Sequence, residues 1–233
     1  MIRIFNLNSG KLLMPSEISY VEKMLFNGYE IFDYFCRRNN LVSYIENIPI
    51  FLVNESSFLE TEKGEGEKPS SDWLGCFKKV NIETIEKKCI FICPERIESI
   101  CSRSEYPIIL AKVLIHEIAH AIMSEYSTYH TVDEFYKWIE EPFANLMALE
   151  IFKLYSQDEY KVVKKFISKQ PSNYKLALDF EKNGFHFWWK WARNKDEIEK
   201  KIMEKDAYLN YVKCNTSKTD EGELERLFDD LFK

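Results

Sequence analysis

The sequence predicts an α+β fold, in which a small N-terminal β-sheet and one long helix precede a mostly helical C-terminal half. Apolar residues recur at three- and four-residue steps between residues 16 and 38, which indicates a helix. Short apolar or β-branched runs, typical of strands, lie between residues 48 and 93. From about residue 106 onward, nearly every apolar residue recurs with the helical period.

The first part of the chain is predicted to contain a helix, a strand and a surface loop, in that order. The helix covers 16–38, and Gly28 is the place at which it could break. The run 48–53 is short, apolar and β-branched, and Pro49 favours an edge strand or a strand start. The segment 54–71 is rich in Glu, Gly and Lys, which predicts a surface loop.

Two further strands and a helix start are expected before the helical half. The runs 73–77 and 88–93 are consistent with a hairpin or two neighbouring strands, and Pro94 begins a helix. Cys89 and Cys93 are interpreted as strand side chains, because they lack the close C-x-x-C spacing of a zinc site. The later helices are predicted over about 107–124, 132–155, 158–168, 173–183, 187–205 and 221–232.

The composition indicates one ordinary globular domain. The chain has 233 residues with 45% hydrophobic residues and only 7 Gly and 7 Pro, which excludes collagen-like, low-complexity and wholly disordered classes. At ~100–200 residues per domain, we expect a single domain over 1–233. Its α/β part covers about 1–105 and its helical part about 106–233, with the motif helix at about 107–124.

Charge and targeting signals point to a cytoplasmic protein with reduced thiols. The net charge is −6 without a basic block, so neither nucleic acid nor an anionic membrane is an expected partner. The N-terminus lacks a secretion signal, and the most apolar window, 106–123, is interrupted by Lys112, His116, Glu117 and His120. The six cysteines are expected to be thiols, because a chain of this size needs no disulfides. Nothing in the sequence selects an oligomeric state.

The motif that carries chemistry is H-E-x-x-H, formed by His116, Glu117 and His120 within an apolar helix. At ~100° per residue the two histidines lie ~40° apart on one helix face, so both imidazoles can reach one ion. Two imidazoles and a carboxylate among Ile, Leu and Val are costly to bury without a partner, and a divalent cation supplies one. The alternative is a pair of core histidines satisfied by hydrogen bonds, with a surface Glu.

A catalytic zinc site usually has three protein ligands, so a third must come from elsewhere in the chain. The candidates are His130, His186 or a carboxylate. Glu141 lies 21 positions after His120, on the next predicted helix, and its neighbour Glu140 is the main rival. We favour Glu141.

H-E-x-x-H followed by a helical Glu at this distance resembles the gluzincin branch of the zincin metallopeptidases, the thermolysin-like arrangement. The resemblance covers about 73–150 and implies one Zn²⁺ per chain, held by His116, His120 and Glu141. In that family an acidic residue four positions after the ligand Glu hydrogen-bonds a zinc-binding His. Asn145 has this position here, and its amide can accept from an imidazole N–H without adding charge.

Two further comparisons with zincins bear on the chain. The metzincin motif requires Gly and a third His where this chain has Met123 and Tyr126, so that branch is excluded. In zincins an edge strand ahead of the motif helix holds an extended peptide by main-chain pairing. The segment 88–93 is placed for that role, and the alternative is an ordinary interior strand.

The resemblance implies a zinc-dependent metallopeptidase that hydrolyses a peptide or protein substrate. Glu117 would be the general base for a zinc-activated water, and a donor would face the developing oxyanion. His186 is a candidate donor, and the other candidates are Tyr174, Tyr126, Tyr129 and His130. One alternative is a non-catalytic zincin-like binding or regulatory domain with a structural zinc; another is a metal-free interaction protein. The intact Glu117 favours the peptidase, because a structural site has no use for a base.

Overall fold

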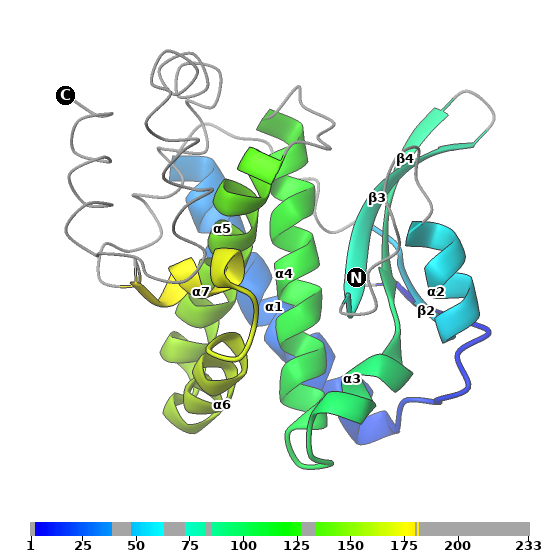
Figure 1. Cartoon of the computed structure of the whole chain (residues 1–233), viewed down its shortest axis with the longest axis horizontal. Coiled ribbons are helices and arrows are strands. Elements are labelled where there is room, and N and C mark those ends of the chain that lie inside the picture. The colour runs from blue at the N-terminus through cyan, green and yellow to red at the C-terminus, as the bar shows by residue number, and fades with distance from the viewer. Residues whose placement is uncertain are drawn as a thin grey trace.

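The structure, a computed structural model, describes residues 3–38, 48–62, 73–82, 85–126, 134–179 and 181. The predicted α+β class is confirmed: four strands and seven helices form in these ranges (Figure 1). In chain order they are β1 (Ile4–Leu7), α1 (Pro15–Arg38), β2 (Ile50–Val53), α2 (Glu55–Glu62), β3 (Gly75–Ile82), β4 (Ile85–Ile92), α3 (Pro94–Ile100), α4 (Tyr106–Tyr126), α5 (Glu134–Tyr155), α6 (Gln157–Ile167) and α7 (Ser172–Asp179).

The four strands form one mixed sheet between two helical layers. Their order is β1-β2-β4-β3; β1, β2 and β4 are parallel, and β3 is antiparallel to β4. Figure 1 shows α2 on one side of the sheet and α4 on the other, where α1, α5, α6 and α7 also lie. The main core therefore lies between the sheet and the larger helical layer, with Ile50, Leu52, Ile90 and Ile92 contributed by the strands.

Helix α4 is the centre of this core. Its residues from Ile109 to Ala119 are all buried, and the helix packs against α1, α5, α6 and the sheet. Among the described residues it is the one helix long and apolar enough to cross a membrane, and 83% of its window Tyr106–Met123 is buried inside the protein. Its apolar character is accounted for by this position in the core.

Two elements, β1 and α2, were not predicted, because the hydrophobic pattern of their residues is weak. Strand β1 was not predicted; it has four residues and only Ile4 is partly buried, so no apolar alternation marks it. Helix α2 replaces the first part of the predicted loop 54–71. Its start is capped by Asn54, whose Oδ1 accepts from the backbone N–H of Ser57 at 2.9 Å, and one fully buried residue, Phe58, anchors it.

Of the two roles left open for 88–93, the ordinary interior strand is confirmed and the peptide-binding edge strand is excluded. Most of that segment belongs to β4, which pairs with β2 on one side and β3 on the other, so it is an interior strand. The edge beside α4 is β3, and no described strand pairs with its outer side. Strand order depends on long-range pairing, which local hydrophobic patterns do not encode. The predicted helices 187–205 and 221–232 lie outside the described residues.

Helix α1 continues through Gly28, the residue at which the sequence allowed a break. A Cβ at Gly28 would lie 3.3 Å from Ile151 Cδ1 and 3.9 Å from Ile115 Cγ1, so the missing side chain lets α1 approach α4 and α5 closely. Gly75, at the start of β3, lies still closer to its neighbours. A Cβ there would be 2.7 Å from Ile92 Cδ1, 2.9 Å from Val113 Cγ1 and 3.1 Å from Glu117 Cγ.

Gly75→Ala is expected to lower the free energy of unfolding by about 1–3 kcal/mol, the usual cost of overpacking a filled core. The new methyl group must displace side chains of β4 and α4 at once. Gly28→Ala is the control, because the new Cβ would lie 3.3 Å from its closest neighbour, against 2.7 Å at Gly75, and alanine favours a helix by about 1 kcal/mol over glycine. Urea unfolding monitored by circular dichroism measures both variants. Equal losses in the two would contradict the close approach of β3 to α4.

Candidate metal centre

The H-E-x-x-H residues lie on α4, which begins at a capping box. The backbone N–H of Ser102 donates to Glu105 Oε2 at 3.1 Å, and the backbone N–H of Glu105 lies 3.4 Å from Ser102 Oγ. The apolar sequence after this start then continues as one helix. His116 and His120 therefore lie one turn apart on the same face, as the motif predicts.

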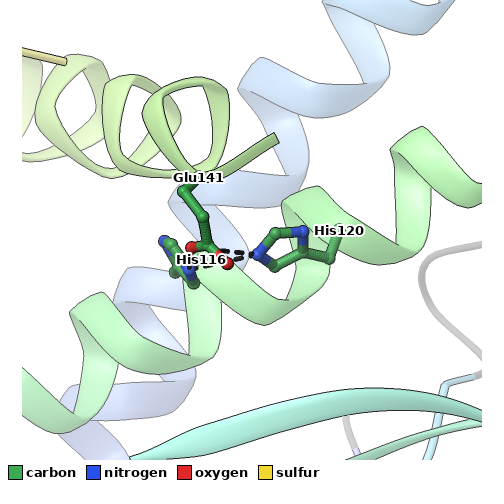
Figure 2. Close-up of side chains that lie close together, drawn as sticks. All are labelled: His116, His120 and Glu141. Atoms are coloured by element: carbon green, nitrogen blue, oxygen red, sulfur yellow. Dashed lines mark hydrogen bonds and ion pairs between the residues drawn. The ribbon is translucent and has the colours of Figure 1, made fainter. Parts of the chain in front are cut away.

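Helix α5 packs beside α4 and brings a carboxylate to the two imidazoles (Figure 2). The Nε2 atoms of His116 and His120 are 3.1 Å apart. Oε2 of Glu141 lies 2.9 Å from Nε2 of His116 and 3.6 Å from Nε2 of His120. The three residues form a His-His-Glu group that could hold a metal ion, as the sequence predicts.

The neighbouring carboxylate, Glu140, faces the other side of the second imidazole. Its Oε2 lies 3.8 Å from Nδ1 of His120, while Glu141 faces the Nε2 atoms. The preference for Glu141 over Glu140 as ligand thus agrees with the geometry. The remaining ligand candidates, His130 and His186, lie outside the described residues.

Burial and neighbouring charges shift the pKa values of the two imidazoles in opposite directions. Burial and the Lys112 ammonium lower the pKa of His116 well below its ordinary value. Burial also disfavours the charged form of His120, but the carboxylates of Glu141, Glu117 and Glu140 together outweigh it and raise the pKa to about 9. The pKa of Glu141 stays well below its usual range, because the imidazoles, His120 foremost, offset its burial. Of the two imidazoles, the surroundings of His120 thus favour the charged form more than those of His116.

Three buried polar atoms at the centre have no hydrogen-bond partner in the described structure: Glu141 Oε2, His116 Nδ1 and Asn145 Oδ1. Glu141 Oε2 is close to the His116 imidazole, but this ion-pair contact lacks hydrogen-bond geometry. A buried carboxylate oxygen without a donor is costly, and a cation between it and the two Nε2 atoms would satisfy it. The donor set therefore fits a metal ion.

Glu117 lies beside the His-His-Glu group and faces the sheet. It is 6% exposed, its carboxylate receives a backbone hydrogen bond from Phe77, and its Cγ is close to Gly75. Burial raises the pKa of Glu117 to about 7, against the opposing effects of His120 and Lys112. This carboxyl group can therefore hold or release a proton near neutral pH.

Lys112 was not predicted to belong to the site; in the sequence it is only one of the residues that interrupt the apolar window 106–123. It lies one turn before His116, is 2% exposed, and has its ammonium 5.6 Å from the Phe166 ring centroid. Burial lowers its pKa to about 8, although Glu141 and Glu117 act in the opposite direction. The sequence signal that could have placed Lys112 near the site is its spacing of four residues from His116, which puts both on one helix face.

Asn145, one helix turn after Glu141 on α5, hydrogen-bonds to residues other than the two histidines. It is fully buried, and its Nδ2 donates to Gln170 Oε1 at 3.2 Å and to the backbone oxygen of Tyr174 at 3.1 Å. No hydrogen bond joins it to His116 or His120 in the structure, so its role as an acceptor from a ligand imidazole stays a prediction.

Among the proposed oxyanion donors, Tyr174 is the one whose side chain the structure describes. Its ring stacks on the imidazole of His116, with centroids 5.9 Å apart and planes at 18°. His186, His130 and Tyr129 lie outside the described residues, and so does the side chain of Tyr126.

No family model, curated protein or solved structure matches the chain. The interpretation of the site therefore depends on its own geometry and chemistry.

Replacing the carboxylate in the group should affect metal binding more than replacing its neighbour. Glu141→Ala removes an oxygen that lies within 3.6 Å of both Nε2 atoms, and we expect it to lose bound metal. Glu140→Gln changes a group 3.8 Å from Nδ1 of His120, and we expect roughly a tenfold weaker affinity, as for partners behind the ligands. Elemental analysis and competition with a chelating dye measure both. Equal retention by the two variants would contradict the ligand assignment.

Metal affinity should fall on acidification, because both imidazoles must be neutral to bind a cation. The raised pKa of His120, about 9, means that a proton competes with the metal throughout the neutral range. The dissociation constant should rise roughly tenfold per pH unit as the pH falls from about 8 to about 6. Calorimetric titration with Zn²⁺ in buffers of different ionisation enthalpy measures the proton released. A constant affinity over this range would exclude ligation by the imidazoles.

Proposed function

We propose that the chain is a zinc-dependent metallopeptidase of the gluzincin type. The observation that carries this proposal is the convergence of three ligand atoms. Two ligands of a tetrahedral zinc ion, each ~2.0–2.1 Å from it, lie about 3.3 Å apart. The observed separations of 3.1, 2.9 and 3.6 Å bracket this value without any rearrangement.

The donor set favours zinc among divalent cations. Two imidazole nitrogens and one carboxylate oxygen are a common ligand set of catalytic zinc, whereas magnesium and calcium prefer oxygen ligands throughout. With His116, His120 and Glu141 as ligands, one position is left for a water molecule or substrate. When bound, zinc would polarise a carbonyl group and activate a water molecule.

Glu117 has the placement and acidity of a general base. It belongs to the same helix turn as the ligands but is not one of them, and its pKa of about 7 lies near the working pH. Its carboxylate would take a proton from the attacking water and pass it to the nitrogen of the leaving amine. A purely structural metal site would gain nothing from a buried carboxyl group held in this way.

The outer edge of β3, with which no described strand pairs, supports an extended peptide as the substrate. An extended peptide can add to a sheet edge through main-chain hydrogen bonds. The edge strand comes close to the general base, since Gly75 approaches the Cγ of Glu117 and Phe77 hydrogen-bonds its carboxylate. A peptide paired with β3 would therefore pass beside the His-His-Glu group.

Glu117→Gln should retain bound zinc but lower peptide hydrolysis by about 10²–10⁴-fold, the usual contribution of general acid–base catalysis. The amide is nearly isosteric and cannot accept the proton. Zinc content by mass spectrometry and cleavage of a fluorogenic peptide library give the two readouts. Glu30→Gln, at an exposed position of α1, is the matched control.

The outcomes of this experiment separate the enzyme from its rivals. A wild-type chain that binds zinc but cleaves no peptide in the library would favour the non-catalytic zincin-like domain. Full activity in Glu117→Gln would overturn the assignment of the base. Absence of bound zinc under reducing, chelator-free conditions would leave a metal-free cluster of buried polar residues.

A further inference from the structure

The two ligand imidazoles differ in what orients them. A metal-binding histidine almost always donates its second ring N–H to a carboxylate, a carbonyl or water, and this hydrogen bond sets the plane of the ring. Nδ1 of His120 has the carboxylate of Glu140 at 3.8 Å. Nδ1 of His116 is buried and has no hydrogen-bond partner among the described residues. Among the described residues, an aromatic ring contacts the His116 imidazole.

Tyr174 of α7 supplies a flat surface against this ring. Its side chain stacks on His116 with an angle of 18° between the planes and 5.9 Å between the centroids. The two rings come from different helices, since α4 carries His116 and α7 carries Tyr174. Rotation of the imidazole out of its present plane would lose this contact and turn Nε2 away from Glu141.

The backbone of Tyr174 is held by a buried amide. Asn145 donates from Nδ2 to the backbone oxygen of Tyr174 and to Oε1 of Gln170, at 3.1 and 3.2 Å. The opposite orientation of the amide would direct Oδ1 at two acceptor oxygens, so the donors determine which way it points. Asn145 is fully buried, so this link between α5 and the first turn of α7 is shielded from water.

The chain just beyond α7 is fastened as well. The carboxylate of Glu181 accepts a hydrogen bond from the Tyr160 hydroxyl and pairs with Lys164 Nζ at 2.8 Å, both on α6. Lys153 of α5 adds a third contact at 3.8 Å. Helix α7 is thus attached near both ends, and the Tyr174 ring has a defined position over the imidazole.

We propose that Tyr174 is a positioning residue of the metal centre, and that its ring, not its hydroxyl group, holds His116 in the plane needed for ligation. The proposal rests on the proposed metal site. It gives α7, an element outside the motif and its ligands, a part in metal affinity. Asn145 then acts on His116 through Tyr174.

The test compares two substitutions that differ in the aromatic ring. Tyr174→Phe keeps the ring and should bind Zn²⁺ within about twofold of wild type, whereas Tyr174→Leu should bind it about 10–100-fold more weakly. Co²⁺ serves as the second probe, because its visible absorption spectrum reports ligand geometry and should change in the leucine variant alone. Tyr155→Leu, at a 42% exposed tyrosine of α5, is the control for loss of an aromatic side chain.

Folding and metal binding are separated by measurements on the metal-free chain. Thermal unfolding shows whether each variant is folded at the titration temperature. The His116 ring protons lie in the ring current of Tyr174. Their chemical shifts should therefore change in Tyr174→Leu and stay nearly the same in Tyr174→Phe. These shifts report stacking directly, including in a chain too weakened for a reliable titration.

Three results would overturn the proposal. They are wild-type affinity in Tyr174→Leu, an equal loss of affinity in Tyr174→Phe, and His116 ring shifts that do not respond to the leucine substitution. A wild-type chain that binds no metal would instead contradict the proposed function. The ring shifts would then still decide whether Tyr174 orients His116.

Discussion

Helix α5 packs against α4, and this contact brings ionisable side chains of the two helices together in the core. Helix α4 is the core helix, yet it carries two histidines, a glutamate and a lysine at buried or nearly buried positions. Ionisable groups are costly to bury unless charges or hydrogen bonds compensate them. Helix α5 brings Glu141 to within 3.6 Å of both imidazoles, so the contact that closes the helical core also assembles the site.

Glu141 and Glu117, two carboxyl groups of the candidate site, have opposite surroundings. Glu141 contacts the imidazoles, and these charges hold its pKa well below the usual range despite its burial. Glu117 faces the sheet, where burial dominates and raises its pKa to about 7. Environments that push the pKa values of two nearby groups apart suit them to different roles, here the proposed ligand and the proposed base. The difference in pKa arises between a residue of α4, Glu117, and a residue of the neighbouring helix α5, Glu141.

The sheet contributes to the site through its edge and not through its centre. Strand β3 is antiparallel to its neighbour, lies at the end of the sheet and starts at Gly75, where no side chain separates it from α4. On the other face of the sheet, α2 covers a smaller apolar cluster that includes Phe58 and Cys93. On the face toward α4, Gly75 brings the backbone of β3 close to the side chain of Glu117.

The features that depend on local spacing could be predicted from the amino-acid sequence alone. The helical period places His116 and His120 on one face, and the predicted helices of the described region agree with α1 and α3 to α7 within a few residues. Only the tertiary structure decided that β4 is interior and β3 the edge, that the 55–62 segment is helical, and that Tyr174 stacks on His116. It also decided which of two adjacent glutamates faces the Nε2 atoms, because neighbours on a helix point ~100° apart and only the packing of α5 on α4 selects between them. Local periodicity is set by backbone geometry within one turn, whereas strand order and ring contacts arise from residues far apart in the chain.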